Sequence, residues 1–291
     1  MKSTLKLILI ALFLASCANE QSKTVVSNAD QVDQAHLKVV EAVLNDRTIV
    51  TLDHRRMAEK SGAKTPPAIA TIFADDSPIV SELIKTNQEV AMDLPFRILA
   101  FEEPLNNQIE LAFTNGEYLA NRHGLSLEEV QKYTDYINGI VDNLPSEMVN
   151  DFDYSGLGQG MGIIKIPSDY SFEESLGRVR MLVHVNQDAR LFAEIDFQKD
   201  AKNFDVQLNP TYMVMFGAPK PGAMAMHDAP RIGLDAFCQK VLIYQDDQGA
   251  VFVCFSDMAA FGDFYYGKHN KGQEVVTQRM KVGLTKLLTK K

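Results

Sequence analysis

The feature that most constrains the fold of this 291-residue chain is an internal repeat. Residues 51–78 align with residues 194–221 at a constant shift, and the match continues from residues 97–113 into residues 240–255. The matched pairs are Asp53 with Asp196, Pro67 with Pro210, Phe73 with Phe216 and Pro78 with Pro221. Self-similarity over such a length indicates two copies of one structural unit.

The hydrophobic pattern predicts the elements of each copy. Residues 97–113 and 240–255 each contain two alternating apolar runs joined by a polar turn, which is typical of a β-hairpin. Residues 25–44 and 163–183 each read as a short strand followed by an amphipathic helix. The expected order is strand, helix, strand, strand, hairpin, helix. A mainly antiparallel sheet with helices on one face makes each copy a two-layer α/β sandwich of the α+β class.

Smaller signals add detail to this outline. Ser171 and Glu174 form a capping-box pattern, and short helical segments are expected after Asp53 and at residues 79–85. The basic stretch 277–291 has the period of a closing helix, which we favour over a helix lying on a membrane surface. The expected boundaries are a first repeat domain at 23–145, a Gly-rich linker at 146–161 and a second repeat domain at 162–291.

The N-terminus predicts export and lipid attachment. Two lysines precede an apolar run from Leu7 to Leu14, the pattern of a secretory signal peptide at residues 1–16. The following Leu-Ala-Ser-Cys resembles the lipobox of bacterial lipoproteins, so Cys17 is expected to carry diacylglycerol and a further acyl group such as palmitate. The alternative is a plain secreted protein with a chance cysteine. Ala18 favours the outer membrane over the inner one if the source is Gram-negative.

Charge limits the partners of the mature chain. Removal of Lys2 and Lys6 with the signal peptide leaves 27 basic and 38 acidic residues, a net charge of −11. Nucleic-acid binding has a basic footprint, so no nucleic-acid partner is expected. Acidity also disfavours docking on anionic lipid, which leaves the anchor at Cys17 as the membrane contact.

Two glycine-containing stretches invite a phosphate-binding interpretation. In residues 212–224, YMVMFGAPKPGAM, glycines follow a strand, but the matching first-copy residues lack them and no P-loop lysine-hydroxyl pair follows. We interpret this stretch as a strand that ends in a proline-fixed turn, without a clean helical period beyond it. In residues 150–162 the glycines alternate and a strand follows them, so we interpret that stretch as a flexible linker.

Several short blocks, recurring in order, resemble a known family. The blocks are LDHRRMA, PPAIATIF, MDLPFRILAFEE and ANRHGL in the first copy, and EIDF, FGAPKPG, IGLD and KVLIYQDD in the second. They are similar to the bacterial and archaeal domain of unknown function 302. The resemblance implies a topology like that of the TATA-binding protein and single-domain relatives that pair as homodimers. It implies no established activity. By extension, we expect the two copies to pack as an intrachain pseudo-dimer.

Candidate chemistry is sparse in this sequence. No nucleophile-elbow serine, H-E-x-x-H, C-x-x-C or EF-hand pattern occurs, so no cofactor and no metal site is predicted. The weak catalytic candidates are Asp53, His54, His123, Asp196 and His269. The alignment of the two copies pairs His123 with His269. Each aspartate has a structural alternative as a helix N-cap. At His54 the second copy has Phe197.

These observations favour one function and leave an alternative open. The preferred interpretation is a membrane-anchored envelope lipoprotein that acts as a binding or scaffolding module for a small molecule or a protein partner. The alternative is a cofactor-independent hydrolase or isomerase that uses an Asp/His pair in the first repeat. Cys238 and Cys254 are expected to stay unbonded: a turn at 246–249 would set Cys254 opposite Val241, roughly 10 Å along the strand from Cys238.

Overall fold

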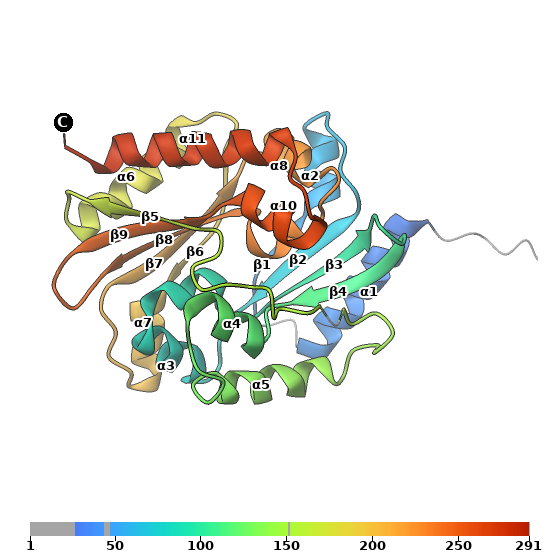
Figure 1. Cartoon of the computed structure of the whole chain (residues 1–291), viewed down its shortest axis with the longest axis horizontal. Coiled ribbons are helices and arrows are strands. Elements are labelled where there is room, and N and C mark those ends of the chain that lie inside the picture. The colour runs from blue at the N-terminus through green and yellow to red at the C-terminus, as the bar shows by residue number, and fades with distance from the viewer. Residues whose placement is uncertain (1–26, 44–46, 151, 291) are drawn as a thin grey trace, which may run out of the picture.

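Two antiparallel sheets, one from each copy of the repeat, organise the chain (Figure 1). The computed structural model describes residues 27–43, 47–150 and 152–290. The first sheet has the order β1-β2-β3-β4 and the second the order β5-β9-β8-β7-β6. The predicted α+β class with two similar units is therefore confirmed. The signal peptide, Cys17 and the strand expected at the start of the first copy lie outside the described residues.

The described elements follow the predicted order in both copies, beginning in the first copy with its first helix. The first copy contains α1 (Asn28–Val43), β1 (Thr48–Asp53), α2 (His54–Lys60), β2 (Ala68–Phe73), α3 (Ile79–Thr86), the 3-10 helix η2 (Gln88–Asp93), β3 (Arg97–Glu103), β4 (Gln108–Phe113), α4 (Gly116–His123) and α5 (Gln131–Val141). The second contains β5 (Ile163–Ser168), α6 (Phe172–Val185), β6 (Arg190–Asp196), α7 (Phe197–Ala201), η3 (Lys202–Phe204), β7 (Thr211–Gly217), α8 (Pro219–Met226), α9 (Ile232–Asp235), β8 (Gln239–Gln245), β9 (Val251–Ser256), α10 (Met258–Tyr266) and α11 (Lys271–Leu288).

Local sequence signals fix several of these helix ends. The predicted capping box of Ser171 and Glu174 starts α6, and Asn270 with Gln273 forms a second one at α11. Helix α4 ends at Gly124 and α10 ends at Gly267, each with φ of 66°. Only glycine adopts this left-handed conformation readily, so both glycines stop their helices at equivalent places.

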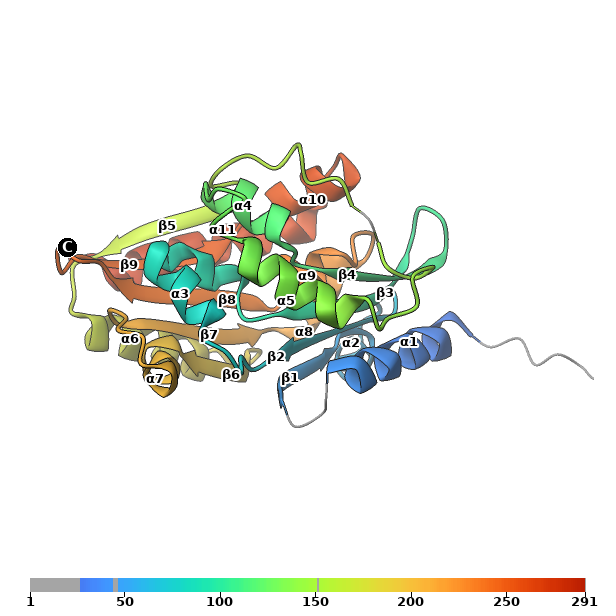
Figure 2. The same cartoon turned by 90° about the horizontal axis from the view of Figure 1, so that it is seen from below.

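Each sheet is covered on one face by helices of its own copy. In α1 the buried residues Val32, Ala35, Val39 and Val43 recur every three or four positions, which sets one apolar stripe against β3. In the second copy α6 and α11 pack over one face of the sheet, as Figure 1 and Figure 2 show. The buried residues there form a separate hydrophobic cluster that includes Val241. The stretch at the C-terminus is thus the closing helix that its period predicts.

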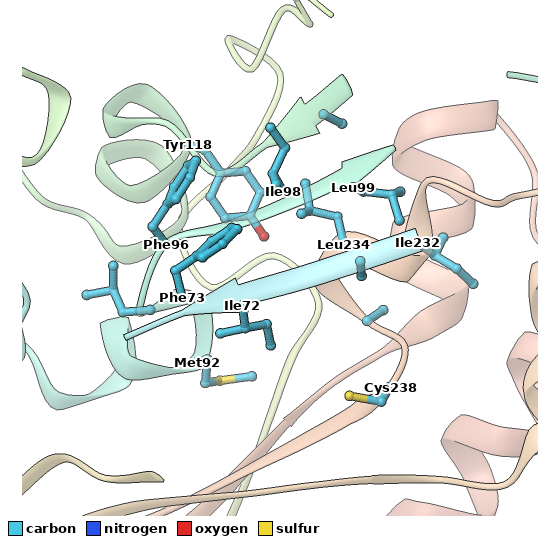
Figure 3. Packing of buried hydrophobic residues seen from close by; sticks show 14 of the residues in the cluster. Ile72, Phe73, Met92, Phe96, Ile98, Leu99, Tyr118, Ile232, Leu234 and Cys238 are labelled. Atoms are coloured by element: carbon cyan, nitrogen blue, oxygen red, sulfur yellow. The ribbon is translucent and has the colours of Figure 1, made fainter. Parts of the chain in front are cut away.

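The opposite face of each sheet is covered by the other copy. Helix η2 of the first copy packs against β7, β8 and β9, whereas α9 of the second copy packs against β2 and β3. Figure 3 shows the result, with Leu234 of the second copy near Leu99 of the first. One hydrophobic cluster therefore runs through both copies.

The structure corrects two interpretations of glycine-rich sequence. Beyond Gly217 the chain forms the helix α8 instead of an irregular turn. The stretch predicted as a flexible linker is held against the rest of the protein, because its residues Tyr154 and Leu157 are buried. A helix can start at Pro219 because a backbone N–H in the first turn has no partner within the helix, so its absence in proline costs no hydrogen bond.

The cysteines of the second copy are free and buried, as expected. Cys254 lies opposite Leu242, one position away from the predicted Val241, because the connection between β8 and β9 is longer than the assumed turn. Among the described residues, no helix is both long enough and apolar enough to cross a membrane.

Candidate functional site

The predicted aspartates cap the helices that follow them. The Asp53 carboxylate accepts a hydrogen bond of 2.8 Å from the amide of Arg56 and also binds the Arg56 guanidinium. Asp196 accepts a hydrogen bond of 2.9 Å from the amide of Lys199 at the start of α7. No hydrogen bond among the described residues joins either aspartate to a histidine.

His54 is a buried residue at the contact between the copies. Its ring lies 5.5 Å from that of Phe237, centroid to centroid, and neither ring nitrogen has a hydrogen-bond partner. Burial, reinforced by the positive charge of Lys240, lowers the pKa of His54 to about 3. His54 is therefore neutral near pH 7 and is held by apolar packing. Phe197, its counterpart in the second copy, is buried to the same extent.

His123 belongs to a buried ion cluster that sequence reasoning missed. Its Nε2 lies 2.7 Å from the carboxylate of Asp93, which also accepts hydrogen bonds from Arg122. Burial alone would raise the pKa of Asp93, but Arg122, His123 and Arg97 together hold it well below its ordinary value. Arg122 also reaches Ser256 of the second copy at 3.3 Å. The cluster thus joins the two copies, and the Asp93 carboxylate is fully engaged by its neighbours.

His269 lies apart from these groups on the surface. Its ring nitrogens lie 2.9 Å from Asp263 and 3.0 Å from Glu274, and these carboxylates raise its pKa. By the helix ends at Gly124 and Gly267, the counterpart of His123 is Tyr266, so the sequence alignment of His123 with His269 is wrong by three positions. The helix-ending glycines are the equivalent positions, and His269 lies in the loop beyond the second of them.

A second buried cluster surrounds Lys240 at the start of β8. Its ammonium donates a hydrogen bond of 3.2 Å to the carbonyl of Leu234, and burial followed by the charge of Arg97 lowers its pKa to about 8. Burial raises the pKa of the neighbouring Asp235, whose carboxylate accepts a hydrogen bond of 2.5 Å from Tyr265.

Both copies contribute to a groove between α2 and α8, with a volume of about 550 Å³. We call it the α2–α8 groove. It is lined by Met57, Lys60 and Ser61 of the first copy and by Asp188, Arg190, Pro219, Lys220, Pro221 and Met224 of the second. Three cations face one acid there, although the whole chain is acidic. In the part of the chain that the structure describes, neither Lys60 nor Lys220 forms an ion pair.

The glycines of the 212–224 stretch have a packing role beside this groove. A Cβ at Gly222 would lie 2.0 Å from the ring of Phe237, and one at Gly217 would lie 3.1 Å from it. Both glycines thus allow the chain to pass against Phe237. Pro219 and Pro221 remove two backbone N–H groups from the first turn of α8, so the turn is a poor phosphate cradle.

Comparison with known proteins explains the repeat. The model of a family described as "Domain of unknown function DUF302" matches residues 23–144 and again residues 164–287. The chain belongs to the DUF302 family. The predicted tandem repeat of that domain is thereby confirmed.

The similar proteins of known sequence or structure match only in part. The chain is 30% identical over 98 residues to the fluoride-specific ion channel FluC 1 of Brucella suis, covering 34% of this chain and 38% of the channel. The FluC 1 channel of Brucella abortus matches at the same identity over 36% of its length. The chain thus spans less than two-fifths of these curated relatives. A solved DUF302 protein from Bacillus stearothermophilus matches with a TM-score of 0.36 and 11% identity, over 44% of this chain and 96% of that one.

The two DUF302 copies differ at one buried pair of residues. In the first copy Phe73 stacks on Phe96 with ring centroids 6.0 Å apart. At the same register in the second copy, Phe216 lies opposite Gln239. An amide thus replaces a ring in the core of the second DUF302 copy.

Proposed function

We propose that this DUF302 chain is a binding protein that holds a small, negatively charged molecule in the α2–α8 groove. The observation that carries the proposal is the cluster of Lys60, Arg190 and Lys220 around a hollow that both copies form. Cations without acidic partners attract an anion, and a cleft focuses their field. Ligand sites also occur preferentially where two domains meet.

The size and walls of the groove suit a small organic anion. Its volume of about 550 Å³ lies within the range of roughly 300–1,000 Å³ that is usual for small-molecule sites. Met57 and Met224 supply apolar surface beside the cations, and methionine adapts its shape to different ligands. The expected ligand therefore combines one or more negative groups with an apolar part.

Binding is favoured over catalysis by the contacts of the candidate catalytic groups. Asp53 and Asp196 cap helices, His54 is buried without a polar partner, and the carboxylate next to His123 is occupied by Arg122. The groove itself is lined by cations, one acid, one serine, methionines and prolines. The first repeat does contain one Asp/His pair, Asp93 with His123, but both side chains are fully buried and the carboxylate is also bound by Arg122. The hydrolase or isomerase alternative therefore stays a hypothesis.

The proposed location is the cell envelope, through a lipid on Cys17. This part of the proposal rests on the N-terminal sequence, where a lysine-flanked apolar run ends in Leu-Ala-Ser-Cys. The binding groove would then act close to a membrane surface, on molecules that pass through the envelope.

Titration calorimetry of the mature chain tests the groove. The probes are benzoate and phenyl phosphate, which join an apolar ring to a carboxylate and to a phosphate respectively. We expect saturable binding of at least one probe that weakens with rising salt, because the attraction is electrostatic. The double variant Lys60→Gln/Lys220→Gln should bind that probe at least ~10-fold more weakly, which corresponds to about 1.4 kcal/mol.

The matched control is Lys281→Gln, since Lys281 is an exposed lysine that does not line the groove. It should leave the affinity unchanged. Equal loss of affinity in the control and in the double variant would show that overall charge, and not the groove, attracts the probe. Absence of saturable binding by either probe would refute the proposed ligand class.

A further inference from the structure

A buried amide without a hydrogen-bond partner marks a second hollow in the molecule. Gln239 is 3% exposed, yet neither its side-chain oxygen nor its side-chain nitrogen has a partner among the described residues. Buried polar groups of native proteins are nearly always hydrogen-bonded, so an unpaired amide in a well-packed strand calls for a function.

The first copy shows that the fold does not require an amide at this position. Its counterpart is Phe96, which packs on Phe73 and also contacts Phe113 edge to face. An aromatic ring fills the same place without any unpaired polar atom. The amide of Gln239 is therefore a specific property of the second copy.

The side chain of Gln239 faces a small cavity beneath α11. Alternate residues of a strand share a face, and Val241 and Ile243 of β8 belong to the cluster under α6 and α11. Gln239 lies on that same face and lines a cavity of about 150 Å³. Phe216, Phe237 and Met280 form apolar walls of the cavity. We call it the Gln239 cavity.

One acid and one base line the same cavity. Asp188, from the loop before β6, and Arg279, on α11, are both exposed side chains. Within the described part of the chain, neither side chain forms an ion pair. The charges of this cavity thus balance, in contrast to the α2–α8 groove, where cations outnumber the acid.

We infer that the Gln239 cavity binds a small zwitterion of the amino-acid type. Arg279 matches a carboxylate, Asp188 matches an ammonium group, and the Gln239 amide can both donate and accept a hydrogen bond inside. The apolar walls of the cavity can contact a short hydrocarbon side chain of the ligand. The cavity is small, with a volume of about 150 Å³, so the smallest amino acids are the expected ligands.

Calorimetry with L-alanine, glycine and L-serine on the mature chain tests this inference. Acetate and ethylamine serve as half-ligands, because each carries only one of the two charges. We expect saturable binding of at least one amino acid and at least ~10-fold weaker binding of both half-ligands. An acetate affinity equal to that of alanine would overturn the zwitterion assignment and leave a simple anion site.

The deciding variant is Gln239→Leu, which keeps the side-chain size but removes both hydrogen-bonding atoms. It should weaken amino-acid binding at least ~10-fold, whereas Gln278→Leu, an exposed neighbour that does not line the cavity, should have no effect. Unchanged binding by Gln239→Leu would refute the site. If that variant fails to fold, Arg279→Gln decides instead, because it changes an exposed side chain and should cause a comparable loss.

The two proposed sites can be tested independently of each other. Asp188 lines both hollows, so it is not used to separate them. The Lys60→Gln/Lys220→Gln variant should retain amino-acid binding, and Gln239→Leu should retain binding of the groove probe. Loss of amino-acid binding in the lysine variant would show that the cavity and the groove are one site and would overturn the inference of a second one.

Discussion

The guanidinium of Arg122 lies 2.6 Å from a carboxylate oxygen of Asp93, and neither side chain is exposed to solvent. Asp93 ends η2, which packs on the second sheet, and Arg122 also contacts Ser256 of the second copy. A pair of charges that is fully removed from water must be kept together, because each alone would be buried without compensation. The attachment of the two copies therefore depends on an ion pair that lies within the first.

Loss of this ion pair should strongly destabilise the protein. We expect Asp93→Asn to lower the free energy of unfolding by about 3–5 kcal/mol, because it leaves the Arg122 charge buried and unpaired. Glu82→Gln, which breaks the exposed pair of Glu82 with Lys132, should cost at most about 1 kcal/mol. Denaturant titration at pH 7 measures both. Equal effects of the two substitutions would contradict the role assigned to the buried pair.

His54 should make the protein sensitive to mild acid. In the unfolded chain a histidine takes up a proton near pH 6.5, whereas folded His54 stays neutral down to about pH 3. Below pH 6.5 the unfolded state therefore binds more protons, and stability falls as the pH falls. Between pH 6.5 and 4.5 the loss should amount to about 2–3 kcal/mol.

The substitution His54→Phe should remove that part of the acid sensitivity. Phe197 occupies the equivalent buried position, so the fold accepts the ring. Stability at pH 7 should be unchanged or higher, since no hydrogen bond of His54 is lost. Unfolding free energies measured from pH 7 to 4.5 give the profile, and His184→Asn, at an exposed histidine, is the control. A profile as steep as that of the wild type would exclude His54 as its source.

The two copies should remain associated when the chain between them is cut. A protease site inserted between the exposed residues Gly158 and Gln159 leaves the anchoring residues Tyr154 and Leu157 in place. Because one hydrophobic cluster extends through both copies, we expect the cleaved halves to co-elute on gel filtration. Separate elution as two folded halves would speak against the proposed intrachain pseudo-dimer.

Lipid attachment should depend on one sulfur atom. We expect Cys17→Ser to abolish incorporation of labelled palmitate and to release the protein from the membrane fraction, since the thioether to diacylglycerol cannot form. Cys254→Ser, at a buried free cysteine, should retain the label if the protein folds. Retention of the label by the Cys17 variant would identify a different anchor.

Features that depend on neighbouring residues could be predicted from the sequence. The tandem repeat, both hairpins and the capping box of Ser171 and Glu174 are recorded in short stretches, and each is present in the structure. The same holds for the helix after Asp53, because an N-cap acts on amides only a few residues away. The expected disposition of helices on one face of each sheet also follows from local periodicity.

Features that depend on residues far apart in the chain could not be predicted from the sequence. Asp93 and Arg97 are only four residues apart, but the packing of α4 against η2 is needed to bring Arg122 to Asp93. The groove and the Gln239 cavity require α2, α8 and α11 to be placed in space first. The sequence contains one signal for the cavity: at the start of the strand 239–245, Gln239 stands where the first copy has Phe96.

Joining the copies in one chain has a consequence for their symmetry. In a homodimer of identical subunits, any substitution appears twice, so a polar residue at the place of Phe96 would open both cores at once. A tandem chain encodes the two places separately, and here one keeps its stacked rings while the other holds an amide. The first copy can thus keep a fully packed core, and the second can have a cavity for a ligand without a matching loss of stability in the first.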